Sequence, residues 1–315
     1  MDILKLKAPV KDYLWGGQKL RKDFNKESKS EIIAESWELS AHPDGASIID
    51  NEPYQSLSFI DYLEKKGNQV IGKNYHGERF PILNKFIDAK GSLSIQVHPE
   101  DDYAQTHEND NGKTEMWYIV DADPDSYIYY GVKESVSKEE VSKAIEEGSI
   151  ESLLNKVAVK KGDSFFIEAG TIHAIGAGIV IYEVQQNSNV TYRVYDFKRK
   201  DKDGKERDLH VRQALEVSNL EPNKVYEFSN ENQIDPSLVR LCKSEYFDVF
   251  KGEVTNQSLK ITEESFQALT FLEGSGRILA GQEINYKKGD SFFIPAQDGS
   301  YTIEGTGEFI LSSLA

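Results

Sequence analysis

Short strand-like runs, in many of which apolar and polar positions alternate, recur along most of the chain. They are rich in Val, Ile, Tyr and Phe and are separated by Gly, Asp and Asn; examples are residues 92–97, 115–120, 126–131, 178–185, 190–197, 266–274 and 307–314. Alternation places every second side chain on one face of a strand, and β-branched and aromatic side chains favour that conformation. Many short strands between turn signals predict a mainly β protein built as a sandwich or barrel.

Three segments have a helical pattern instead, at residues 58–68, 136–154 and 211–219. In the second of them, Ser137 and Glu140 have the spacing of a capping box, and apolar residues follow at helical intervals. We therefore expect a helix near residues 137–154, and in all a few helices added to a β framework.

The octapeptide KKGDSFFI occurs twice, at residues 160–167 and 287–294. Each copy predicts a Gly-Asp turn followed by a strand, so the repeat indicates two β domains of similar build. The expected boundaries are residues 1–225 and 238–315, with a polar linker at residues 226–237. A histidine, His173, follows only the first copy, and Ser300 takes the equivalent place after the second.

Composition and charge restrict the classes of molecule that the protein is expected to bind. The chain has 315 residues and a formal net charge of −16 at pH 7, so its average field repels nucleic acid and anionic lipid. Cys242 is the one cysteine, which excludes an intrachain disulfide and fits a reducing cytoplasm. Neither a signal peptide nor an apolar run of membrane-spanning length is found. The sequence predicts a soluble cytoplasmic protein.

Two histidines stand in strands beside other potential ligands. Gln96 and His98 share one strand face, and His173 follows a turn after another strand. Glu115 lies in a third strand, two residues after Lys113. Two imidazoles and a carboxylate from separate strands are a ligand set that a catalytic zinc uses while it keeps an open position. A glutamine oxygen is an acceptable additional ligand.

Several motifs together resemble a known family. They are WGG at residues 15–17, AESWELSAHPDG at 34–45, PILNKFIDA at 81–89, QVHP at 96–99, GKTEMWY at 112–118 and YEVQQNSNVTYRVYDF at 182–197. The run from Gly162 through Gly170 to His173 is similar to the second motif of the cupin superfamily, with Glu168 in place of its proline. In this order the motifs resemble the short bacterial form of type I mannose-6-phosphate isomerase. The resemblance implies two cupin (jelly-roll) β-barrels, with helices in or on the first.

The resemblance also implies an activity and a set of site residues. The activity is a zinc-dependent isomerisation of mannose 6-phosphate and fructose 6-phosphate, by proton transfer between C1 and C2 through an enediol(ate). The implied zinc ligands are Gln96, His98, Glu115 and His173. The implied catalytic residues are Arg193, Glu183 and Lys85, and the implied substrate-binding residues are Lys113, Ser94 and Arg193. The proton-transfer group is left open among Glu183, Lys85 and a zinc-bound water, as is the cation that holds the phosphate.

Two other functions are compatible with a cupin scaffold. One is a non-haem iron or manganese dioxygenase or decarboxylase. Those cupins usually have His-x-His at the first motif, and the Gln96-x-His98 pair here argues for zinc and against oxygen chemistry. A non-catalytic phosphosugar-binding bicupin is the other alternative. We expect one zinc per chain, because a serine follows the second repeat and no histidine occurs after His210. The partner is a small phosphosugar; a monomer and a homodimer are both compatible with the sequence.

Overall fold

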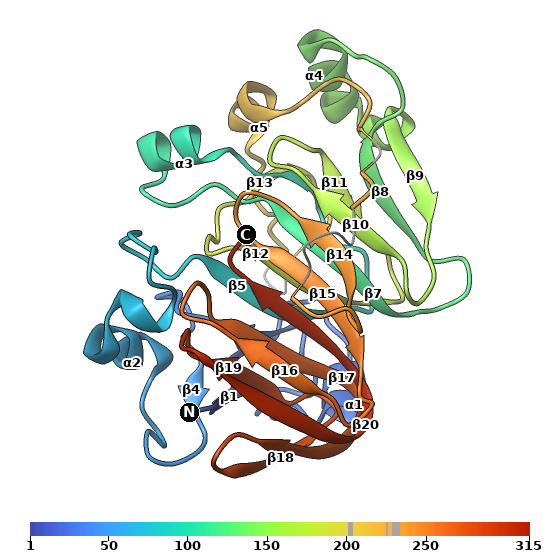
Figure 1. Ribbon diagram of the computed structural model, residues 1–315. Helices are drawn as coiled ribbons and strands as arrows, with labels where there is room; N and C mark the ends of the chain where they lie inside the picture. Colours follow the sequence, from blue (N-terminus) through green and yellow to red (C-terminus); the bar gives the residue numbers. More distant parts are fainter. Residues whose placement is uncertain (201–203, 225, 229–233) are drawn as a thin grey trace. The chain divides into compact units, whose positions relative to one another are not determined.

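The computed structural model (Figure 1) describes residues 1–200, 204–224, 226–228 and 234–315. The chain forms two compact units that are not consecutive in sequence. The first unit is Met1–Lys11, Gln18–Phe86 and Glu227–Ala315, and the second is Asp12–Gly17 and Ile87–Tyr226. Strand β5 (Ile82–Ala89) crosses the boundary between them. The mainly β architecture predicted from the alternating pattern is confirmed.

The first unit is built on one large antiparallel sheet. Its strands lie in the order β14 (Val239–Lys243), β15 (Asp248–Glu253), β20 (Gly299–Ser313), β17 (Gln267–Leu279), β19 (Ser291–Ile294), β1 (Leu4–Lys7) and β4 (Ile48–Ile49), while β16 (Ser258–Ile261) pairs with β20 and β18 (Glu283–Lys287) with β17. The long strands β17 and β20 run side by side (Figure 1). Strand β2 (Val10–Lys11) pairs separately with β3 (Glu35–Leu39).

The second KKGDSFFI copy supplies strand β19 of this sheet. All four residues of β19 are buried, and Phe292 and Ile294 belong to the apolar core of the first unit. Strand β1 pairs with β19 in the register Leu4 to Phe293. This pairing places the start of the chain in the same unit as its end.

The second unit contains two sheets. One has the order β13 (Tyr192–Tyr195), β6 (Ile95–Val97), β11 (His173–Ile175), β8 (Tyr127–Val132) and β9 (Leu154–Ala158). In the other, β7 (Glu115–Ala122) pairs with β10 (Ser164–Ile167) on one side and β12 (Ile179–Gln186) on the other. The first KKGDSFFI copy forms β10. Its two phenylalanines are only half-buried, so the identical octapeptide packs less deeply here than in the first unit.

The helices are short. They are α1 (Lys19–Phe24), α2 (Phe59–Lys66), α3 (Asp101–His107), α4 (Lys138–Glu147) and α5 (Val211–Val217), with 3₁₀ turns at Asn68–Val70 and Ile150–Ser152. The predicted capping box is present at α4: the Ser137 hydroxyl accepts from the Glu140 amide, and the Glu140 carboxylate accepts from the Ser137 amide. The helix ends at Glu147 rather than near residue 154, because the next residue, Gly148, caps it in a left-handed conformation.

The compact units divide the chain differently from the expected domains at residues 1–225 and 238–315. The cause is the pairing of β1 with β19, which joins N-terminal residues to the C-terminal sheet. Residues 229–233 of the expected linker lie outside the described residues.

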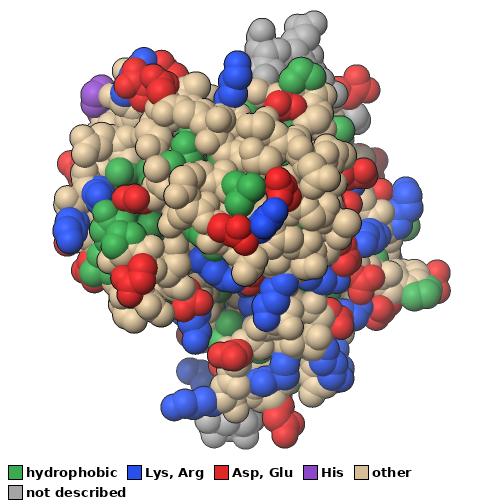
Figure 2. Space-filling view, turned by 60° about the horizontal axis from the view of Figure 1, so that its bottom comes forward, with side chains coloured by type: hydrophobic (Ala, Val, Ile, Leu, Met, Phe, Trp, Pro, Cys, Tyr) green, Lys and Arg blue, Asp and Glu red, His purple; other side chains and the backbone are tan. Residues whose placement is uncertain are grey.

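The surface carries both signs of charge. Figure 2 shows a face on which acidic and basic side chains are interspersed, so the excess of acidic groups is not gathered there into a single block. Among the helices of the described residues, none combines the length and the apolar character needed to cross a membrane.

Candidate metal centre

Three of the predicted site residues form a row across the five-stranded sheet of the second unit. Arg193 in β13 is the register partner of Gln96 in β6, and Gln96 is the partner of His173 in β11. Directly opposed residues of antiparallel strands project to the same face, with Cβ atoms about 5 Å apart. The sheet register therefore places a guanidinium, an amide and an imidazole side by side.

The other sheet of the second unit contributes two carboxylates joined by one indole. Glu115 and Trp117 are two residues apart in β7, and Glu183 of β12 lies opposite Trp117. The Trp117 indole N–H donates to Glu183 at 2.8 Å and to Glu115 at 3.1 Å. All three side chains are buried. The shared donor holds both carboxylates on one face.

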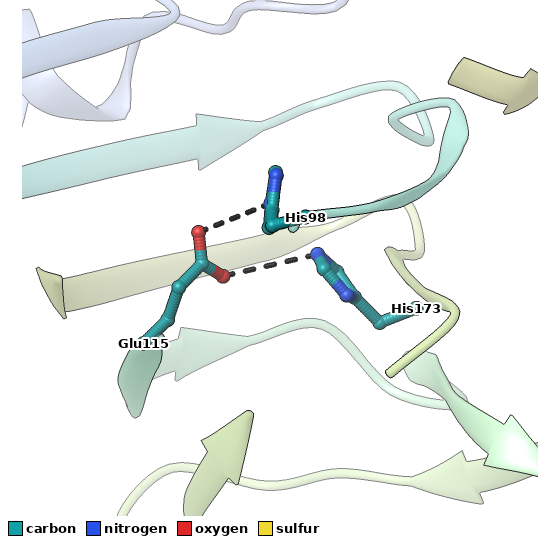
Figure 3. Close-up of side chains that lie close together, drawn as sticks. All are labelled: His98, Glu115 and His173. Carbon is teal, nitrogen blue, oxygen red and sulfur yellow. Dashed lines mark ion pairs between the residues drawn. The ribbon is translucent and has the colours of Figure 1, made fainter. Parts of the chain in front are cut away.

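His98, Glu115 and His173 converge at one point (Figure 3). One potential ligand atom from each lies within 4.8 Å of the others. The Nε2 atom of His98 is 3.3 Å from Glu115 Oε1, and that of His173 is 3.8 Å from Glu115 Oε2. At most 1% of any of the three residues is exposed. Two imidazole nitrogens thus face one carboxylate inside the protein.

Each of these imidazoles is oriented by a backbone carbonyl. His98 Nδ1 lies 2.8 Å from the carbonyl oxygen of Val190, and His173 Nδ1 lies 2.8 Å from that of Thr171. Because a carbonyl oxygen only accepts, Nδ1 carries the proton and Nε2 keeps a free lone pair. This is the tautomer that a metal-binding histidine needs.

The protonation states of His98, His173 and Glu115 also favour the binding of a cation. Burial, together with the nearby charge of Lys113, lowers the pKa of His98 to about 3, and burial also lowers the pKa of His173. Burial alone would raise the pKa of Glu115, but the charge of Lys113 and the contacts with His98 outweigh it and hold that pKa well below its ordinary value. The imidazoles are therefore neutral and the carboxylate is ionised near pH 7.

Two further predicted residues adjoin the cluster. Gln96 Nε2 is 3.3 Å from His173 Nε2, and a half-turn of the amide exchanges its nitrogen for its oxygen. The ammonium of Lys113 lies 2.8 Å from Glu115 Oε1 and 3.3 Å from His98 Nε2. These acceptors already attract a cationic side chain, and the donor set of two imidazole nitrogens and a carboxylate suits Zn²⁺.

The remaining predicted residues are Ser94, Arg193 and Lys85. Ser94 is buried, two residues before Gln96 in the chain. Arg193 is half-buried and is the register partner of Gln96. Lys85 lies in the first unit, on β5, where its ammonium is 5.4 Å from the centre of the Trp37 ring.

Sequence reasoning assigned no role to Trp117 or to the carbonyls of Val190 and Thr171. Trp117 had a detectable signal, because it stands two positions after Glu115 in the same strand. The two carbonyls had none, since every residue carries one and the fold alone decides which of them meets an imidazole.

Comparison with known proteins identifies the family. A model of the type I phosphomannose isomerase catalytic domain matches residues 3–129, and a model of the mannose-6-phosphate isomerase cupin domain matches residues 238–314. The chain is 38% identical over 316 residues to mannose-6-phosphate isomerase ManA of Bacillus subtilis, with 99% of each chain covered. This chain belongs to the type I phosphomannose isomerase family. The suspected resemblance is thereby confirmed.

Other members of the family support the same assignment. The mannose-6-phosphate isomerase of Streptococcus mutans is 38% identical over 315 residues, covering 99% of this chain and 98% of that protein. The crystal structure of mannose 6-phosphate isomerase from Bacillus subtilis superposes with a TM-score of 0.90 at 36% identity, with 99% of each chain covered. The expected cupin fold is confirmed.

Proposed function

We propose that this chain is a zinc-dependent mannose-6-phosphate isomerase that interconverts mannose 6-phosphate and fructose 6-phosphate. The observation that carries the proposal is the buried His98–Glu115–His173 cluster in a chain that is 38% identical, over its full length, to isomerases with this name. The reaction moves a proton between C1 and C2 of the open sugar through an enediol(ate), so it needs a base and a means of stabilising negative charge.

His98, Glu115 and His173 would hold the metal, with Gln96 as a fourth protein ligand. Zn²⁺ bound there would polarise the sugar carbonyl and stabilise the negative charge that develops on its oxygen. The protein's contribution is the neutral, fixed tautomer of both histidines, which the carbonyls of Val190 and Thr171 enforce.

Glu183 is the proton-transfer residue that the geometry supports best. It shares the Trp117 indole N–H with Glu115, so its carboxylate lies beside the proposed metal ligands on the same face. A carboxylate in that position can accept the proton from one sugar carbon and return it to the next. Lys85, held over the Trp37 ring in the first unit, and a zinc-bound water are the other candidates.

Arg193 and Lys113 would handle the substrate's negative charge, and Ser94 would add a hydroxyl contact. Lys113 contacts the metal-ligand cluster directly, so we assign its charge to the reacting end of the sugar. Arg193 has a planar guanidinium that suits an oxyanion such as phosphate. Its position in the Arg193–Gln96–His173 row places it at the edge of the same face.

A coupled assay tests the proposal directly. Purified protein with mannose 6-phosphate should produce fructose 6-phosphate, and a chelator should abolish the rate until Zn²⁺ is returned. Glu183→Gln should lower kcat by roughly 10²–10⁴-fold, because the amide cannot accept the proton. Lys85→Met should be measured in parallel. If kcat is nearly unchanged in Glu183→Gln and falls strongly in Lys85→Met, Lys85 is the base. Binding of mannose 6-phosphate without turnover would instead support the phosphosugar-binding alternative.

A further inference from the structure

The segment Arg207–His210 is bonded to strand β13 at Arg193. The Arg193 backbone N–H donates to His210 Nδ1 at 3.1 Å, and the His210 backbone N–H donates to the Arg193 carbonyl at 2.8 Å. The Arg193 side chain also takes part, since its Nη1 donates to the Asp208 carbonyl at 2.7 Å. One short segment therefore fixes both the backbone and the guanidinium of Arg193.

Asp196 binds the first residue of this segment, Arg207. Its buried carboxylate accepts from Arg207 through Nε at 2.7 Å and Nη2 at 2.6 Å, which is a two-point contact. Arg199 donates to the same carboxylate and also to the carbonyl of Ser92, on the chain leading into β6. A two-point Arg–carboxylate pair fixes orientation as well as distance.

These contacts leave one edge of Arg193 for a ligand. Its Nε is buried and has no hydrogen-bond partner within the described residues, while Nη1 is occupied by the Asp208 carbonyl. A buried N–H without an acceptor is costly, so an oxyanion bound there would satisfy it.

We propose that His210, Arg207 and Asp196 are positioning residues that present the guanidinium of Arg193 to the substrate in one orientation. The inference rests on the proposed function, in which Arg193 binds a substrate oxyanion. In this proposal the three residues act through Arg193 and not by direct contact with the substrate.

The contact at His210 requires a neutral imidazole, because Nδ1 must accept the Arg193 N–H. The groups that face His210 are Arg193, Asp208 and Glu108, with the Tyr192 ring 6.1 Å away. Burial, followed by the charge of Arg193, lowers the pKa of His210. The surroundings therefore keep His210 in the form that can hold Arg193.

The test compares a variant that loses the acceptor with one that keeps it. His210→Ala removes the acceptor, whereas the side-chain oxygen of His210→Asn can still accept from the Arg193 N–H. We expect His210→Ala to lower kcat/KM by roughly 10²-fold, as misplacement of a substrate-binding group does. His210→Asn should recover most of that loss, and the exposed His76→Ala should match the wild type. Equal kinetics of the Ala and Asn variants would overturn the proposal.

A double-mutant cycle separates positioning from folding. In an Arg193→Ala background, the further change His210→Ala should cost little, because the group that it positions is gone. Arg207→Lys should behave like His210→Ala, while Arg212→Lys on α5, where Arg212 pairs with Glu216, serves as the matched control. Fully additive losses would contradict the proposal. An inactive wild type, or an Arg193→Ala protein with normal kinetics, would instead refute the proposed function of the site.

Discussion

At the scale of single residues, the site depends on which nitrogen of each histidine carries the proton. His98 and His173 are both bonded through Nδ1 to a carbonyl oxygen 2.8 Å away, although His98 follows β6 and His173 begins β11. Both therefore present Nε2 to Glu115. Replacing either histidine removes one of the few atoms that can hold a metal there.

His173→Ala should bind zinc poorly and lose most isomerase activity. The second unit has an apolar core of its own around β6, β8 and α4, so the fold should survive. The melting temperature should fall modestly, since a bound metal stabilises only the folded state. Metal analysis, kinetics and a melting curve on one preparation check this. Full activity in a metal-free His173→Ala protein would rule out the assigned site.

The low pKa of His98 predicts a pH dependence of stability in the metal-free protein. The pKa of His98 is about 3 when folded, against an ordinary value of 6.5 when the chain unfolds. Between these values the unfolded chain binds a proton that the folded chain does not. The free energy of unfolding should therefore fall as the pH drops below about 6.5.

Urea unfolding at pH 7 and pH 5, with chelator present, measures this effect. His98→Gln cannot titrate, so its stability should change less between the two pH values than that of the wild type. Identical changes in both proteins would show that His98 does not contribute in this way.

At the scale of secondary-structure elements, the sequence predicted the start of a helix where a capping pattern was present. The Ser137–Glu140 capping box located the start of α4 in the sequence, and Ser58 likewise caps α2. Helices α1 and α3 were not predicted. They have six and seven residues, and α3 buries only Ala104, so neither has enough apolar periodicity to stand out.

The two copies of KKGDSFFI have the same turn conformation but different surroundings. Gly162 and Gly289 both adopt positive φ, at 95° and 88°, as the predicted turns require. A Cβ at Gly162 would meet nothing within 4 Å, whereas one at Gly289 would lie 2.2 Å from the Phe24 carbonyl oxygen.

Gly162→Ala should thus cost about 1–2 kcal/mol, the usual penalty of the left-handed conformation. Gly289→Ala should cost clearly more, because the Phe24 backbone must also move. Urea midpoints of the two variants, compared with the wild type, provide the test. Equal destabilisation would mean that the close approach of Gly289 to Phe24 does not add to the loss of stability.

At the scale of the whole molecule, sequence predicted the class of fold and singled out His98, Glu115 and His173, which the structure brings together, but it did not reveal which distant strands pair. The pairing of Leu4 with Phe293 joins residues at opposite ends of the chain. An alternating pattern shows that a segment is a strand, but many strands have similar faces, and the pattern does not select the partner. For the same reason, the spacing of Trp117 from Glu115 can be read from the sequence, whereas its bond to Glu183 depends on the pairing of β7 with β12.

The repeat differs at the ligand position in a way that bears on metal content. His173 is fully buried after the first copy, whereas Ser300 is exposed after the second. A serine hydroxyl is a poor zinc ligand at neutral pH. We therefore keep the prediction of one zinc per chain.

Titration of chelator-treated protein with Zn²⁺, followed by the formation of fructose 6-phosphate, tests the central claim most directly. Activity should start near zero, rise in proportion to added zinc and reach its plateau at one equivalent per chain. The same titration of His173→Ala should remain flat at these concentrations. Substantial turnover before any zinc is added, or a plateau at two equivalents, would contradict a single His98–Glu115–His173 metal site as the basis of isomerisation.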